Sequence, residues 1–184
     1  MSERRAPRLT RSAGGTPPAL VIAMTKRPDG GSVLSCTRAD GTATWQRHQG
    51  RQGHFFPLHD LTHYAVETTL GFRHGFFGLI ADGWDVEDTG GKGNRGPLPE
   101  EALLVEQIVG LISLGRGSDG PWTADELDEQ LRGVTRDPAL VSEARLTEER
   151  LGQLLAALTE LVASWALVEP GGTMTLSFDQ RPAA

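Results

Sequence analysis

Apolar and polar residues alternate along residues 19–48. The run is rich in β-branched residues and is interrupted at "PDGG" and at "DG", which are both signals for tight hairpin turns. This pattern predicts three antiparallel strands, over residues 19–27, 32–38 and 42–48. Because strands joined by short turns usually pair with their neighbours, we expect a three-stranded meander.

The apolar spacing changes to three or four residues after Pro57. A proline suits the first turn of a helix because the N–H that it lacks would be unpaired there, and Gly71 suits the C-terminal stop. "HGFFGLIADGW" predicts a second, short helix, and residues 82–97, rich in glycine and acids, predict a long loop of the kind that often binds ligands. The apolar face of the first helix comprises Leu58, Leu61, Ala65 and Thr69.

Helix signals continue to about Trp165. Four starts are marked by proline, acids or capping residues, at Pro99, Thr123, Asp137-Pro138 and Thr147. After the turn "EPGG", apolar residues alternate with Thr and Ser up to Phe178, which predicts a C-terminal hairpin. The fold class that follows is α+β, with a small antiparallel sheet (the N-terminal meander plus the C-terminal hairpin) packed against about five helices.

The expected domain organisation is simple. A chain of 184 residues with ordinary hydrophobic content suits one domain. We expect a disordered N-terminal arm at 1–18, a single α+β domain at 19–178 and a C-terminal tail at 179–184.

The charge balance of the chain is acidic, with a net charge of −6 and a pI of about 5.4. Nucleic acids and anionic membranes are bound through basic surfaces, so neither is an expected partner, and a small molecule or a protein stays open. A single cysteine, Cys36, excludes an intrachain disulfide and a zinc cluster built on cysteines. Because no secretory signal or membrane-spanning run is evident, the expected location is the cytoplasm.

The candidate chemistry lies in "FFPLHDLTHYAVE", residues 55–67. Residues four apart on a helix are rotated by only about 40° from one another, so His59, His63 and Glu67 share one face of the predicted helix. Two neutral imidazoles at this spacing can point at one ion, and they suit zinc or another late divalent metal. The sequence therefore predicts a zinc-type site with His59, His63 and Glu67 as ligands.

The pentapeptide "HDLTH", residues 59–63, resembles the HExxH signature of zinc metallopeptidases, with Asp60 in the place of the glutamate. In those enzymes the histidines bind zinc and the glutamate is the general base for the zinc-bound water. The resemblance thus implies His59 and His63 as ligands and Asp60 as the catalytic base. The pentapeptide is also similar to the HDxxH of a ubiquinone-biosynthesis family, and "GFRH", residues 71–74, is similar to a Gly-x-x-His turn that supplies a third zinc ligand in one metallopeptidase clan.

The third ligand is open at this point. Glu67 would be a ligand or a group that orients an imidazole, and the alternatives are His74, Glu106 or an acid of the 82–97 loop. Lys92 and Arg95 in "GGKGNRG" would suit an anionic ligand. The prediction is a divalent-metal-binding protein that, as an enzyme, would be a metal-dependent hydrolase. The alternative is a non-catalytic interaction module whose histidine face is structural or docks a partner.

Overall fold

The computed structural model describes residues 18–91, 95–115 and 122–179. The arm expected at 1–18, the tail expected at 179–184 and Lys92 lie almost wholly outside these residues. The division into arm, domain and tail therefore stays a prediction.

Four strands form one antiparallel sheet: β1 (Leu20–Lys26), β2 (Ser32–Arg38), β3 (Ala43–His48) and β4 (Thr173–Phe178). The strand order is β3-β2-β1-β4, so the meander is extended at its β1 edge by the C-terminal strand, with Leu20 opposite Phe178. The predicted α+β class is confirmed. In place of a complete C-terminal hairpin, the described chain contributes one strand there, because the residues before it belong to a long helix.

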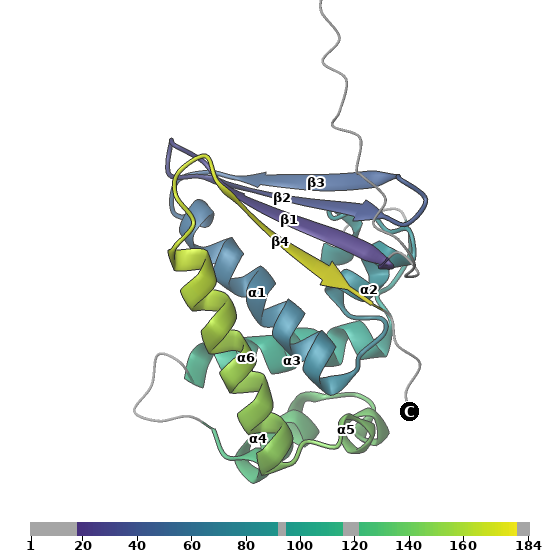
Figure 1. Cartoon of the computed structure of the whole chain (residues 1–184). Coiled ribbons are helices and arrows are strands. Elements are labelled where there is room, and N and C mark those ends of the chain that lie inside the picture. The colour runs from purple at the N-terminus through teal and green to yellow at the C-terminus, as the bar shows by residue number, and fades with distance from the viewer. Residues whose placement is uncertain (1–17, 92–94, 116–121, 180–184) are drawn as a thin grey trace, which may run out of the picture.

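The helices lie on one side of the sheet, as Figure 1 shows. They are α1 (Gln52–Leu70), α2 (Phe76–Ala81), α3 (Glu100–Gly115), α4 (Ala124–Val134), α5 (Pro138–Ala144) and α6 (Glu148–Ala166), with a 3-10 turn η1 (Asp88–Gly90). The buried face of β1 presents Leu20, Ile22 and Met24 to this layer. Within the described residues, no helix combines the length and apolar character that crossing a bilayer requires.

Helix α1 is the central element, since it contacts β2, β3, α2, α3 and α6. It begins at Gln52 and not near Pro57, so the predicted start was wrong by more than one turn. Packing explains the earlier start: Gly53 lies against the turn between β1 and β2, where a Cβ would come within 2.6 Å of the Gly30 carbonyl oxygen. The ring of Phe56 also stacks on His48 of β3, at 4.1 Å between centroids. These contacts anchor the first turn of α1 to the sheet.

The capping signals in the second half of the chain are confirmed. Thr123 accepts a hydrogen bond from the backbone N–H of Glu126, whose carboxylate accepts one from the Thr123 backbone in return. Asp137 and Thr147 cap α5 and α6 with their side-chain oxygens, which accept hydrogen bonds from the backbone N–H groups of Ala139 and Arg150. These helix starts are local interactions, which explains why the sequence could show them.

Candidate metal centre

The imidazole of His63 lies in the interior, with only 1% of the residue exposed. Its Nδ1 lies 3.4 Å from Oε1 of Glu67, and its Nε2 lies 3.3 Å from Oε1 of Glu106. Neither nitrogen is aligned for a regular hydrogen bond with a described residue. Burial by itself lowers the pKa of His63, but the carboxylates of Glu106 and Glu67 outweigh it and raise the pKa to about 9. The two carboxylates therefore favour the cationic form of His63 when no metal is bound.

His59 stands one turn before His63 on the same face of α1. The two rings are 4.8 Å apart between centroids and nearly perpendicular, and Phe55 stacks on the His59 ring. Burial and the neighbouring His63 lower the pKa of His59 to about 4, against the opposite influence of Glu106. His59 is therefore a neutral imidazole near pH 7, which is the form that binds metals.

Glu106 comes from α3 and completes the group. One ligand atom from each of His59, His63 and Glu106 lies within 4.8 Å of the other two, so these three residues could hold a metal ion. The Glu106 side chain is 44% exposed. Its partial burial acts to raise its pKa, but the adjacent, positively charged ring of His63 prevails and lowers it. The three residues thus come from two helices: α1 contributes the two imidazoles, and α3 contributes the partly exposed carboxylate of Glu106.

Glu67 is placed differently from its predicted role as the third ligand. Its carboxylate is buried and accepts hydrogen bonds from the backbone N–H groups of Phe77 (3.2 Å) and Gly78 (3.0 Å), in the first turn of α2. Gly75 makes room for it, since a Cβ there would lie 2.5 Å from the Glu67 Cδ. Glu67 thus ties α1 to α2 and faces the far nitrogen of His63, which is the orienting position that the sequence left open as an alternative.

Asp60 is also buried, with 4% of the residue exposed, and it lines a pocket of about 210 Å³ beside the three-residue group. Burial raises the pKa of Asp60 to about 7, with Glu106 adding to the rise and His63 opposing it. His59 and Glu106 line the same pocket, together with residues from β3, α2 and the 86–90 loop. The group thus opens onto a small cavity that five segments of the chain enclose.

Of the remaining predicted ligands, the loop acid Glu87 lines the same pocket, and the others lie elsewhere. His74 pairs through Nδ1 with Oε2 of Glu101, at 3.0 Å. Among the loop acids, Asp85 lies 3.7 Å from Arg38, and Asp88 lies 3.8 Å from Arg95.

Arg95 also donates a hydrogen bond to the carbonyl of Gly83 and lies over the ring of Trp84, so it is engaged within the loop. Lys92, the other cation expected to contact an anionic ligand, lies outside the described residues.

The sequence offered Glu106 as one of four candidates for the third ligand, beside Glu67, His74 and an acid of the 82–97 loop. The signal for it was a single acid within the apolar run of α3, which by itself also fits a residue at the edge of a helix face. The pocket walls contributed by Gln46 and Thr89 were not predicted, because no local pattern distinguishes them from ordinary strand and loop residues.

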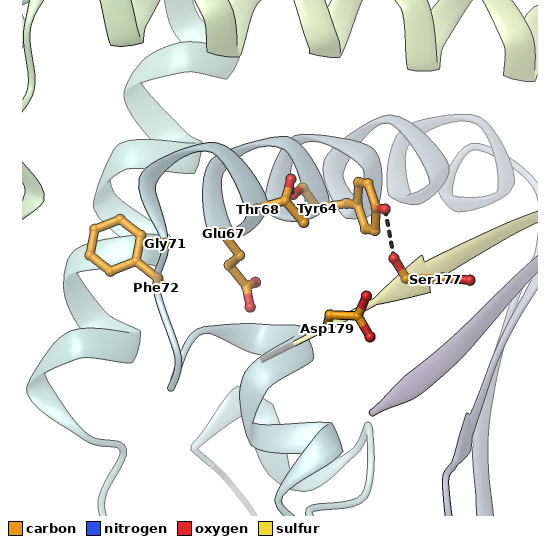
Figure 2. A pocket seen from close by; sticks show the side chains of 7 residues that line it. All are labelled: Tyr64, Glu67, Thr68, Gly71, Phe72, Ser177 and Asp179. Carbon is orange, nitrogen blue, oxygen red and sulfur yellow. Dashed lines mark hydrogen bonds between the residues drawn. The ribbon is translucent and has the colours of Figure 1, made fainter. Parts of the chain in front are cut away.

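A second hollow, of about 260 Å³, lies at the C-terminal end of α1 (Figure 2). Tyr64 and Thr68 lie on its wall, and their hydroxyls donate to the carbonyls of Ser177 and Tyr64 respectively. Both hydroxyls are therefore occupied by structural hydrogen bonds, that of Tyr64 to β4 and that of Thr68 within α1. The group that could bind a metal lies around His63 instead.

No protein-family model matches this chain, and neither does a curated protein or a solved structure.

Proposed function

We propose that this chain binds one divalent metal ion, zinc by preference, through His59, His63 and Glu106, and uses it to activate water for hydrolysis. The observation that carries the proposal is the convergence of these three ligand atoms within 4.8 Å at the wall of a pocket. A site with three protein ligands leaves one position for water or substrate, which is typical of catalytic zinc. The metallopeptidase and quinone-family resemblances agree with this in only five residues, so they specify no substrate.

The spacing supports a tetrahedral ion. Zinc bonds of about 2.0–2.1 Å place two ligand atoms about 3.3 Å apart, and His63 Nε2 and Glu106 Oε1 are separated by 3.3 Å. To match this, the nitrogen of His59 would move inward by up to about 1.5 Å from the 4.8 Å limit, within reach of a side-chain rotation. Two imidazoles and one carboxylate are a donor set that zinc accepts.

Two further carboxylates support the chemistry. Glu67 faces Nδ1 of His63 and would fix this ring so that Nε2 points at the ion, as carboxylates commonly do behind metal-binding histidines. Asp60 lies in the pocket next to the group and would accept the proton of the metal-bound water. The cytoplasmic location stays a prediction from the sequence.

Metal analysis tests the site directly. Untagged protein, loaded with zinc and desalted, should retain one zinc per chain, and His63→Ala and Glu106→Gln should lose it. His54→Ala and Glu100→Gln are matched controls, because both residues are exposed and Glu100 lies on the same helix as Glu106. Wild-type protein that retains no zinc, iron or manganese would refute the metal centre.

The same variants address the alternative of a structural histidine face. In that case His63 is a protonated partner of Glu67 and Glu106, and removing it lowers stability without any change in metal content. A docking role would involve His59 and the exposed Phe55, because His63 itself does not reach the surface.

Hydrolysis is tested separately with a small activated ester. Zinc-loaded protein should cleave p-nitrophenyl acetate, and Asp60→Asn should keep its zinc but lose about 100-fold in rate, the scale of a missing general base. Equal rates for wild type and Asp60→Asn would remove Asp60 from the mechanism and leave the metal centre standing.

A further inference from the structure

The pocket beside the candidate metal centre has an acidic lining. Asp60, Glu87 and Glu106 contribute carboxylates to it, and none of the described residues that line it is a lysine or an arginine. The arginines that approach this loop are already paired, Arg38 with Asp85 and Arg95 with Asp88, and Arg47, which lies beside Glu87, is paired with Asp29. His63, 3.3 Å from Glu106, compensates part of this negative charge in the metal-free protein, but it gives up its proton when it binds a metal.

Two of these carboxylates form no hydrogen bond or ion pair with any residue that the structure describes. Asp60 is nine-tenths buried and faces the pocket, yet it accepts no hydrogen bond from any described residue. Glu87 is exposed at the pocket mouth and forms no ion pair among the described residues, in contrast to its neighbours Asp85 and Asp88. Burying a carboxyl group without a hydrogen-bond donor costs free energy, so Asp60 would gain from a donor on a ligand or from a metal-bound water.

The other walls restrict size and polarity. Phe56, Phe76 and Val86 give the pocket apolar sides, while Gln46 and Thr89 add polar atoms. Its volume of about 210 Å³ lies below the range of about 300–1,000 Å³ that is typical of sites for drug-sized ligands. The pocket thus suits a small molecule with a flat or aliphatic body.

We infer that the pocket takes a small ligand that carries one protonated amine, which faces Asp60 and Glu87, and a neutral nitrogen or oxygen donor, which faces the metal. This inference rests on the proposed metal centre and adds the charge of its ligand. A divalent ion with Glu106, Asp60 and Glu87 around it leaves one negative charge in excess, which an ammonium group neutralises. A carboxylate or phosphate in the same position would lie against Glu87 without a compensating cation, so the site selects against anions.

Two ligands that share one metal-binding ring test the inference. Histamine carries an ammonium group on an imidazole, imidazole-4-acetate carries a carboxylate on the same ring, and both charged groups are ionised at pH 7.5. Affinities are measured by calorimetry on zinc-loaded protein, with unsubstituted imidazole as the baseline for the metal alone. Histamine should bind at least about 10-fold tighter than imidazole-4-acetate, a difference of about 1.4 kcal/mol.

Glu87→Gln should reduce this preference to less than about 3-fold while zinc content stays at the wild-type level. Asp85→Asn, which neutralises the acid two residues before Glu87 and outside this pocket, should keep the wild-type preference. Equal or tighter binding of imidazole-4-acetate by the zinc-loaded wild type overturns the ligand charge and leaves the metal centre intact. Failure to retain zinc, which is measured first, overturns the metal centre and this inference with it.

Discussion

Gly75 is the residue whose substitution tests the geometry of the centre most directly. In Gly75→Ala, the new Cβ would lie 2.5 Å from Cδ and 2.7 Å from both Cγ and Oε2 of Glu67. These separations are far inside van der Waals contact, so Glu67, which is buried and also lines the hollow at the C-terminal end of α1, must shift to relieve them. The backbone of Gly75 is at φ −73°, which an alanine adopts freely, so the collision with Glu67 is the dominant effect.

The expected loss in the free energy of unfolding follows from the hydrogen bonds that Glu67 loses when it moves. To avoid the methyl group its carboxylate has to leave the N–H groups of Phe77 and Gly78, and hydrogen bonds to a charged group contribute about 1.5–3 kcal/mol each. Overpacking a tight site costs about 1–3 kcal/mol by itself. Because the protein relaxes along whichever route costs less, we expect a loss of about 2–4 kcal/mol in the free energy of unfolding.

Urea denaturation measures this loss as a lower midpoint at an unchanged m-value. Gly110→Ala is the matched control, because this glycine is within α3 and a Cβ there meets nothing within 4 Å. Alanine is the better helix former by about 0.5–1 kcal/mol, so this control should be slightly more stable than wild type. Gly75→Ala should also bind zinc about 10- to 100-fold more weakly, since Glu67 no longer orients His63.

A double-mutant cycle isolates the cause. In the background of Glu67→Ala, the further change Gly75→Ala has no carboxylate to displace and should cost less than about 0.5 kcal/mol. Gly75→Ala with wild-type stability would refute the reasoning, and so would an equal loss in both backgrounds.

Three further outcomes are expected from the same contacts. The pKa of His63 is raised from 6.5 to about 9, so the metal-free protein should lose stability as pH rises through this window, and the raised pKa of Asp60 adds a loss at lower pH, between 3.8 and about 7. Zinc affinity, which needs His63 deprotonated, should increase between pH 6.5 and 9. Titrations of unfolding and of zinc binding at several pH values measure both. Removal of zinc with EDTA should lower the melting temperature of wild-type protein and leave that of His63→Ala unchanged, and an equal effect on both would contradict specific binding. Thr123→Ala removes one half of the capping box of α4 and should cost about 1 kcal/mol by urea denaturation, with Thr159→Ala on the surface of α6 as a control.

Much of the fold could be predicted because its signals are local. The turn sequences and the alternating residues placed β2 at its observed bounds, and the capping residues Thr123, Asp137 and Thr147 marked helix starts correctly. The four-residue spacing of His59 and His63 placed both imidazoles on one face of α1, since the geometry of a helix alone fixes that relation. The start of α1 was missed because packing of Gly53 and Phe56 against the sheet extends the helix beyond its own sequence signals.

The sequence by itself therefore determined the elements, the acidic character and the pair of histidines. Tertiary structure alone decided that α3 brings Glu106 to His63, that the first turn of α2 occupies Glu67, and that Asp60 faces a small pocket. The physical reason is the range of the interactions. Hydrogen-bonded turns, caps and helix faces depend on neighbours within a few residues, whereas the third ligand depends on how two helices pack against each other beneath the sheet, which no short stretch of sequence encodes.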